Sequence, residues 1–251
     1  MSQDGPHAYR PRRSGRARVN DYDRLAEAYT ALNEDGIANA YYERPAILAL
    51  AGEVTGRRIL DAGCGSGPLF AELRDRGAVV SGVDSSAGML ELARRRLGDG
   101  VDLRLADLRE PLPFPDDAFD DVMASLVLHY LEDWGPTLAE LRRVLRTGGR
   151  LIVSVDHPFA VHVTQRQAGR DVRYLTTYNW TEEWTMDGRT VPMSFYHRPV
   201  HAMTDAFTAA GFRLAVISEP QPLPAARELF PDEFRALSTG PSFLFFVLEA
   251  G

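Results

Sequence analysis

Short apolar runs alternate with polar segments of helical period through the middle of the chain. The runs predict buried strands, at residues 58–62, 78–83, 101–105, 119–125 and 150–155. The intervening segments predict helices, at about 67–76, 86–97 and 136–146, the last closing at Gly148-Gly149. Strands joined by helices build a parallel, doubly wound α/β sheet, which binds ligands at the carboxyl ends of its strands.

Helical patterns also flank this core. Leu25, Ala28, Tyr29 and Leu32 share helical spacing and predict a helix that begins near Tyr22. A second helix is expected from residue 41 to about 51. Beyond the core, 200–210 predicts a helix that ends at Gly211, and 212–218 and 242–249 predict two closing strands.

Residues 157–198 are too many for a simple connection between core elements. Asp187-Gly188 in the run 184–191 predicts a β-hairpin. The segment concentrates aromatic side chains, at Tyr174, Tyr178, Trp180, Trp184, Phe195 and Tyr196. We expect a lid over a bound substrate, and the alternative is that these aromatics form a small core of their own.

The amino-acid composition excludes several classes of protein to which this chain could belong. The 251 residues, 45% of them hydrophobic, suffice for one large domain, and neither a membrane span nor a signal peptide is visible. All 28 basic residues are arginine, which excludes catalysis through a lysine Schiff base and Tyr-x-x-x-Lys dehydrogenase chemistry. Cys64 is the single cysteine, so an internal disulfide is excluded. We expect a cytoplasmic protein, in which Cys64 is a small residue packed near a ligand.

Charge argues against a nucleic-acid partner. The net charge is −7, and basic residues cluster only in residues 1–18, which we predict to be a disordered tail. Residues 19–251 are expected to form one domain. Its parts are predicted at 19–56 (helical cap), 57–156 (core), 157–198 (lid) and 199–251 (closing helix and strands).

The most informative stretch is the glycine-rich run at residues 59–68. Gly63, Gly65 and Gly67 follow an apolar strand and precede a helix, as in a turn where a ligand approaches the backbone closely. The amino end of that helix offers free N–H groups to a polar ligand. Asp84 ends the next strand, 17 residues beyond Gly67, where an acid suits a bidentate hydrogen bond to a ribose diol.

The spacing Asp61-x-Gly63-x-Gly65-x-Gly67 resembles the first motif of class I S-adenosylmethionine (SAM) dependent methyltransferases, whereas nicotinamide folds favour Gly-x-Gly-x-x-Gly. Later segments resemble that family in order, at 83–90, 106–108, 119–122, 128–131 and 145–152. The resemblance is to the small-molecule, methyltransferase-11-like type. It implies a Rossmann-like seven-stranded sheet with an antiparallel last strand, an N-terminal helical cap and a lid insertion after strand five.

The same resemblance implies SAM as cofactor and S-adenosylhomocysteine (SAH) as product. The residues it assigns to the cofactor are Tyr22, Tyr29, Arg44, Asp61, Gly63, Cys64, Gly65, Asp84, Ser85, Met89, Asp107, Leu108, Ser125 and Leu126. Tyr22 and Tyr29 are equally well explained as core aromatics, and Arg44 as a surface residue. We expect the loss of Asp84 to weaken cofactor binding and to leave the cofactor-free chain as stable as before.

Methyl transfer requires a close, aligned and dry nucleophile, and a base only where the acceptor must lose a proton. His129, His157 and His197 stand where a base could act, and each is also explained as a structural histidine. His129 comes first, because its loop resembles one that borders the methyl group in related enzymes. The spacing of the three indicates no metal site, and we expect none.

The sequence favours some classes of acceptor over others. Residues 124–129 lack the Asn-Pro-Pro-Tyr motif of nucleic-acid amino methyltransferases. An aromatic lid favours a small aromatic or partly apolar acceptor with an O, N or C nucleophile, and the family analogy suggests secondary metabolism. We expect no nucleic-acid or membrane partner, and the oligomeric state is open, a homodimer included. The alternative is a SAM-binding protein that catalyses a rearrangement or serves as a binding module. Substrate contacts are expected from Tyr178, Trp180, Trp184 and Tyr196.

Overall fold

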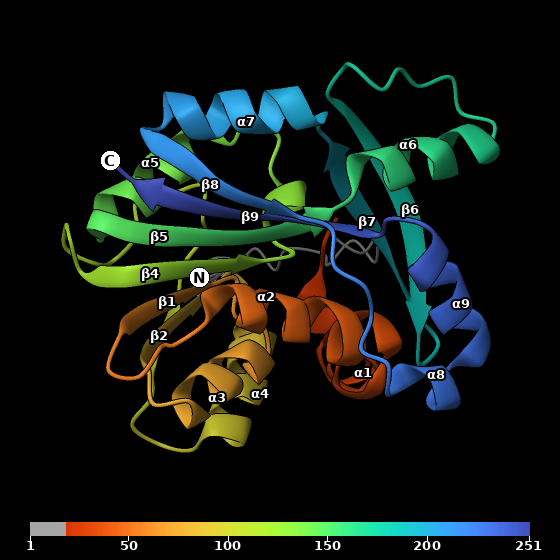
Figure 1. Cartoon of the computed structure of the whole chain (residues 1–251). Helices are drawn as coiled ribbons and strands as arrows, with labels where there is room; N and C mark the ends of the chain where they lie inside the picture. Colours follow the sequence, from red (N-terminus) through yellow and green to blue (C-terminus); the bar gives the residue numbers. More distant parts are fainter. Residues whose placement is uncertain (1–18) are drawn as a thin grey trace, which may run out of the picture.

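A mixed sheet of seven strands carries the core of the computed structural model, which describes residues 19–251 (Figure 1). The predicted tail at 1–18 lies outside the described residues. The strands are β1 (Arg58–Ala62), β2 (Val79–Asp84), β3 (Asp102–Leu105), β4 (Phe119–Ser125), β5 (Leu145–Asp156), β8 (Phe212–Ser218) and β9 (Phe243–Ala250). They are ordered β3-β2-β1-β4-β5-β9-β8. Strands β1 to β5 pair in parallel, and β9 is antiparallel to both of its neighbours, which confirms the predicted sheet.

Helices cover both faces of this sheet, as the apolar runs of its central strands require. Ile59 and Leu60 of β1 and Val122 and Met123 of β4 are fully buried. One face is covered by α5 (Gly135–Val144) and α7 (Val200–Ala209). The other is covered by α2 (Arg44–Ala51), α3 (Pro68–Asp75) and α4 (Ala87–Leu97) (Figure 1).

The predicted N-terminal helices are present and close one end of the sheet. Helix α1 (Tyr22–Asp35) contacts α4 and the hairpin described below. The second helix begins as a five-residue π-helix, η1 (Asn39–Glu43), and continues as α2. A π-turn widens the helix locally, and such turns are frequent at functional sites.

The segment after β5 holds a helix and a hairpin. Strands β6 (Tyr178–Met186) and β7 (Arg189–His197) pair along their whole length around Asp187-Gly188, so the hairpin prediction is confirmed and the hairpin is longer than expected. Both turn residues have positive φ, as a two-residue hairpin turn requires. Helix α6 (Pro158–Gln167) was not predicted. Figure 1 places α1, α6 and the hairpin at the edge where the parallel strands end.

Two features of the core differ from the expectation. Helix α5 ends at Val144 and the chain enters β5 directly, so the prediction that Gly148-Gly149 caps this helix was wrong. Leu145 pairs with Phe119 and Arg150 with Asp121, so the positive φ of Gly148 lies in an irregularity of the strand. The remaining elements are η2 (Leu128–Tyr130), α8 (Ala226–Leu229) and α9 (Pro231–Thr239).

None of the helices among residues 19–251 combines the length and apolar content needed to cross a bilayer. Across the same residues, no three His, Cys, Asp or Glu side chains gather as metal ligands would.

Candidate functional site

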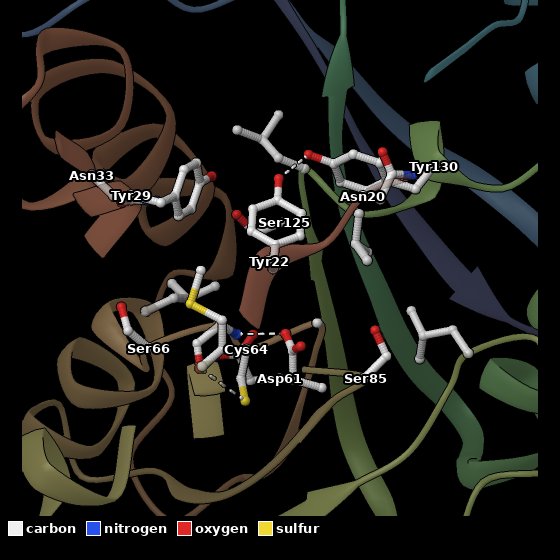
Figure 2. Close-up of a pocket in the computed structure, with 18 of the residues that line it drawn as sticks. Asn20, Tyr22, Tyr29, Asn33, Asp61, Cys64, Ser66, Ser85, Ser125 and Tyr130 are labelled. Atoms are coloured by element: carbon white, nitrogen blue, oxygen red, sulfur yellow. Dashed lines mark hydrogen bonds between the residues drawn. The ribbon is translucent and has the colours of Figure 1, made fainter. Parts of the chain in front are cut away.

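The carboxyl ends of β1, β2 and β4 open into a cavity of about 440 Å³ (Figure 2). Its walls come from the glycine-rich loop, α1 and η1, and from the alternate residues Ser194 and Tyr196 of β7. Every residue that the sequence assigned to the cofactor lines this cavity. They are Tyr22, Tyr29, Arg44, Asp61, Gly63, Cys64, Gly65, Asp84, Ser85, Met89, Asp107, Leu108, Ser125 and Leu126.

The loop glycines serve different purposes. Gly63, Gly65 and Gly67 have φ angles of 81°, 54° and 80°, which disfavour other residues. A Cβ on Gly63 would lie 2.6 Å from a methyl group of Val127, so packing requires that glycine. A Cβ on Gly65 would meet no atom within 4 Å. Gly65 therefore borders free space on the cavity side of the loop, and that space fits a ligand lying against the backbone.

Asp84 joins the loop to the next helix. Its Oδ2 accepts a hydrogen bond from the Gly65 N–H (2.9 Å) and its Oδ1 accepts one from the Ser86 N–H (2.8 Å). Burial raises the pKa of Asp84, and these N–H groups act against that shift. A carboxylate has about four acceptor sites, so both oxygens can still accept from a diol. The two bonds connect the glycine-rich loop and Ser86 to the end of β2, so we now expect Asp84 to contribute to the stability of the cofactor-free chain as well as to cofactor binding.

Asp61, near the end of β1, is a buried acid that lines the cavity. Asp61 is 1% exposed, and its Oδ2 has no hydrogen-bond partner among residues 19–251. Burial, together with the nearby Asp84 and Glu43 carboxylates, raises the pKa of Asp61 to about 8. A buried oxygen without a partner is costly, and it fits a ligand group that donates hydrogen bonds.

Glu43 is a functional candidate that the sequence did not reveal. It is 3% exposed, lines the cavity, and accepts hydrogen bonds from Ser125 Oγ (2.7 Å) and Ser154 Oγ (2.5 Å). Burial raises its pKa, against those two hydrogen bonds. A glutamate is usually exposed to water, whereas Glu43 stands at the end of the π-helix and is bound by serines of β4 and β5.

Tyrosines form the opposite side of the cavity. Figure 2 shows Tyr22, Tyr29 and Tyr130 across from Asp61, and the hydroxyl groups of Tyr22 and Tyr130 share a hydrogen bond. Tyr22 packs edge-on against Tyr29 and Tyr130, with ring centroids 5.1 and 6.0 Å apart. Burial raises the pKa of all three, so the hydroxyls are neutral. Tyr130 was not predicted.

A second cavity, of about 680 Å³, lies beside the first. Both cavities are lined by Tyr29, Asn39, Leu126 and Tyr130, which we call the shared wall. Leu126 has a φ of 48°, a strained conformation for a bulky residue. Its N–H is held by Ser154 O (3.1 Å) and Ser154 Oγ (3.0 Å). Such strain persists only where surrounding contacts impose it, and it clusters at functional sites.

The structure separates the three candidate histidines. Among them, only His129 lines the second cavity; it is 6% exposed, and its Nδ1 lies 3.5 Å from Asp156 Oδ2. Burial lowers the pKa of His129, and the Asp156 carboxylate opposes that shift.

The other two histidines lie outside both cavities and have structural contacts. His157 caps α6, because its Nδ1 accepts from the Phe159 N–H (3.2 Å) while its Nε2 contacts Glu219 Oε1 (2.8 Å). His197 Nε2 lies 2.8 Å from the carbonyl oxygen of Tyr174, to which it donates. The His197 ring also stacks on Tyr178 at 4.5 Å.

The four residues expected to contact the substrate do not all line the same cavity. Trp180 and Trp184 line the second cavity. Tyr196 lines the first cavity, since alternate residues of β7 face opposite sides. Tyr178 lines neither, because its ring stacks on His197.

Similarity to known proteins covers most of this architecture. A profile of the family described as "Methyltransferase domain" matches residues 60–153. The crystal structure of an S-adenosylmethionine dependent methyltransferase from Mesorhizobium loti is 31% identical, with a TM-score of 0.67. That alignment covers 85% of this chain and all of the other.

Two relatives of known sequence match this chain over different shares of their own length. An uncharacterized protein of Haemophilus influenzae is 28% identical over 242 residues, which are 90% of this chain and 94% of that protein. A demethylmenaquinone methyltransferase of Clavibacter sepedonicus is 39% identical over 135 residues, 53% of this chain and 55% of that protein. The chain thus spans about half the length of the second relative.

Proposed function

Because the chain belongs to the SAM-dependent methyltransferases, we propose that it methylates a small molecule held in the second cavity, hereafter the acceptor cavity. The observation that carries this proposal is the shared wall. A cavity that fits the cofactor and a cavity lined by aromatic rings meet at Tyr29, Asn39, Leu126 and Tyr130. Methyl transfer needs the two reactants in contact, and the shared wall is where the two cavities allow it.

The first cavity would hold SAM, which when bound supplies a methyl group made electrophilic by its sulfonium. Asp84 would accept hydrogen bonds from the ribose hydroxyls, and Gly65 would lie against the ligand. Asp61 and Glu43 would receive the ammonium group at the methionine end. Two observations support this assignment: among residues 19–251, Asp61 Oδ2 has no hydrogen-bond partner, and a Cβ on Gly65 would meet no atom within 4 Å.

His129 is the proposed base where the acceptor must lose a proton. It lines the acceptor cavity near the shared wall, since its ring lies 4.5 Å from that of Tyr130. Its lowered pKa keeps the ring neutral and able to accept a proton near pH 7. Asp156, 3.5 Å away, would stabilise the imidazolium that forms. The contacts of His157 and His197 support structural roles, so neither is retained as a base.

The hairpin is the proposed lid of this site, within the predicted lid segment 157–198. Trp184 stacks on Tyr29 of the shared wall (5.9 Å, 14°), and Trp180 stacks on Phe195 (4.6 Å, 25°). These rings would exclude water and contact a small aromatic or partly apolar acceptor. Trp180 and Trp184 also pack in a cluster with Leu25 of α1. The two rings would therefore stabilise the hairpin as well as contact the acceptor.

Relatives act on different acceptors by name, demethylmenaquinone in one case and malonyl-[acyl-carrier protein] in another. Their names therefore do not select an acceptor for this chain. The nucleophilic atom and a place in secondary metabolism stay predictions.

Transfer of label from methyl-labelled SAM, screened over a library of small aromatic and apolar acceptors, tests the proposed function. We expect labelled product with at least one acceptor, and a large loss of rate in His129→Gln with SAH affinity unchanged. Binding of SAH without transfer to any acceptor would instead favour a binding module or a rearrangement.

A further inference from the structure

The acceptor cavity carries negative charge that no lining cation balances. Its ionisable side chains are His129, Asp156, Glu182 and Glu183, together with tyrosines, and no arginine from residues 19–251 lines it. The sequence contains no lysine. Burial lowers the pKa of His129, so this ring does not supply a positive charge near neutral pH. The side chains of Asp156 and Glu182 therefore bring carboxylates to the wall, and no arginine from residues 19–251 lines the cavity beside them.

Both carboxylates stand where an acceptor would touch them. Asp156 ends β5 and lies beside His129, close to the shared wall. Glu182 is on the same face of β6 as Trp180 and Trp184, because side chains alternate along a strand. Its Oε1 accepts a hydrogen bond from the indole Nε1 of Trp184 (2.6 Å), which holds the carboxylate beside the ring.

Arg170 contacts a residue of the cavity wall without lining the cavity. Arg170 donates to Gln165 Oε1 (2.6 Å) and to the carbonyl oxygen of Thr181 (2.9 Å). Gln165 lines the cavity and Arg170 does not. The guanidinium thus contacts the wall through Gln165 and does not itself line the cavity.

Aromatic faces complete the wall. Trp180, Trp184, Phe195 and Tyr130 line the cavity together with the carboxylates. Tryptophan and tyrosine rings attract cations over their faces, and a carboxylate attracts the same charge. An anionic acceptor would meet repulsion from Asp156 and Glu182 and no compensating donor of opposite charge.

We propose that the acceptor is a cationic amine carried on an aromatic or apolar frame. This inference rests on the proposed function, because it assigns the acceptor to this cavity. It names the substrate class and leaves open which atom of the substrate receives the methyl group.

Binding of matched probes to the full chain saturated with SAH tests the inference. The probes are 2-phenylethylamine and 3-phenylpropionate, which share a ring and a two-carbon spacer and carry opposite charge at pH 7. We expect the amine to bind at least tenfold more tightly by calorimetry, with a preference that shrinks as salt is added.

A pair of variants ties the preference to the cavity. Glu182→Gln keeps an oxygen that can accept from Trp184 and removes the charge, so the preference for the amine should fall at least threefold. Asp187→Asn is the matched control, since it removes one charge from the same hairpin outside the cavity. Its φ of 48° suits asparagine, and the preference should be unchanged.

The outcomes separate this inference from the proposed function. Equal or tighter binding of 3-phenylpropionate by the SAH-bound protein would overturn the cationic acceptor and leave methyl transfer standing. An equal loss in Glu182→Gln and Asp187→Asn would also overturn it, because a diffuse charge effect would then explain the preference. Failure of the chain to bind SAH at all would contradict the proposed function itself.

Discussion

The variant Gly65→Ala tests whether Gly65 is needed for ligand binding or only for the backbone conformation of its loop. In Gly65→Ala the new Cβ enters the free space that borders the first cavity, where nothing lies within 4 Å. The φ of 54° also makes any side chain costly, by about 1–2 kcal/mol for a left-handed residue. The variant therefore needs a control that carries the same backbone cost away from the cavity.

Gly56→Ala is that control. Gly56 has a φ of 73°, no atom within 4 Å of the point that an added Cβ would occupy, and a place outside the cavity lining. Both variants should lose a similar amount of stability without ligand. An extra methyl group in a packed contact costs about 1–3 kcal/mol, so only Gly65→Ala should bind SAH roughly fivefold to 150-fold more weakly.

Calorimetric titration with SAH and melting with and without SAH measure the two effects separately. At 100 times the wild-type Kd, SAH should stabilise wild type and Gly56→Ala by about 2.7 kcal/mol. A variant that binds a hundredfold more weakly would keep only about 0.4 kcal/mol of that stabilisation. Equal SAH affinity in Gly65→Ala and Gly56→Ala would refute the placement of the ligand against this loop.

Three further predictions follow from particular contacts. Asp84→Ala should weaken SAH binding at least tenfold in calorimetry and, because it removes two hydrogen bonds to a charged group, lower the stability of the cofactor-free chain by about 3 kcal/mol; unchanged stability would contradict the structural half of this reasoning. Asp61 has a folded-state pKa of about 8, above its ordinary 3.8, so the folded state holds the extra proton and its stability should decline from about pH 4 to pH 8. When melting temperature is measured against pH, wild type should show this decline and Asp61→Asn should lack it. A decline of the same size in both proteins would contradict the raised pKa of Asp61. Trp180→Ala should raise the acceptor KM or lower kcat with SAH affinity unchanged, whereas a lowered melting temperature with intact kinetics would reduce Trp180 to a core residue of the hairpin.

The local sequence pattern was sufficient to predict most strands of the sheet and many residues that line the first cavity. Strand β4 was predicted with its observed bounds, because its apolar run at residues 122–124 is a local feature of the sequence and indicates a strand covered on both faces. Gly65 and Asp84 could be assigned because a strand-turn-helix unit places the loop and the next strand end side by side. The helix cap expected at Gly148-Gly149 failed because glycines also serve strand irregularities, and pairing with β4 decides between the two.

Contacts between distant segments decided the rest. Glu43, at the end of the π-helix, is buried where it accepts hydrogen bonds from Ser125 and Ser154, 82 and 111 residues away in sequence. His129, His157 and His197 look alike in sequence, and their separation depends on partners contributed by Asp156, Glu219 and Tyr174. Short-range periodicity and spacing in the sequence predicted the parallel strands and the glycine-rich loop. The resemblance to a known family implied the cofactor and the antiparallel last strand. Which side chains meet at the acceptor cavity was decided by the packing of the hairpin on α1 and η2, and no local pattern encodes that packing.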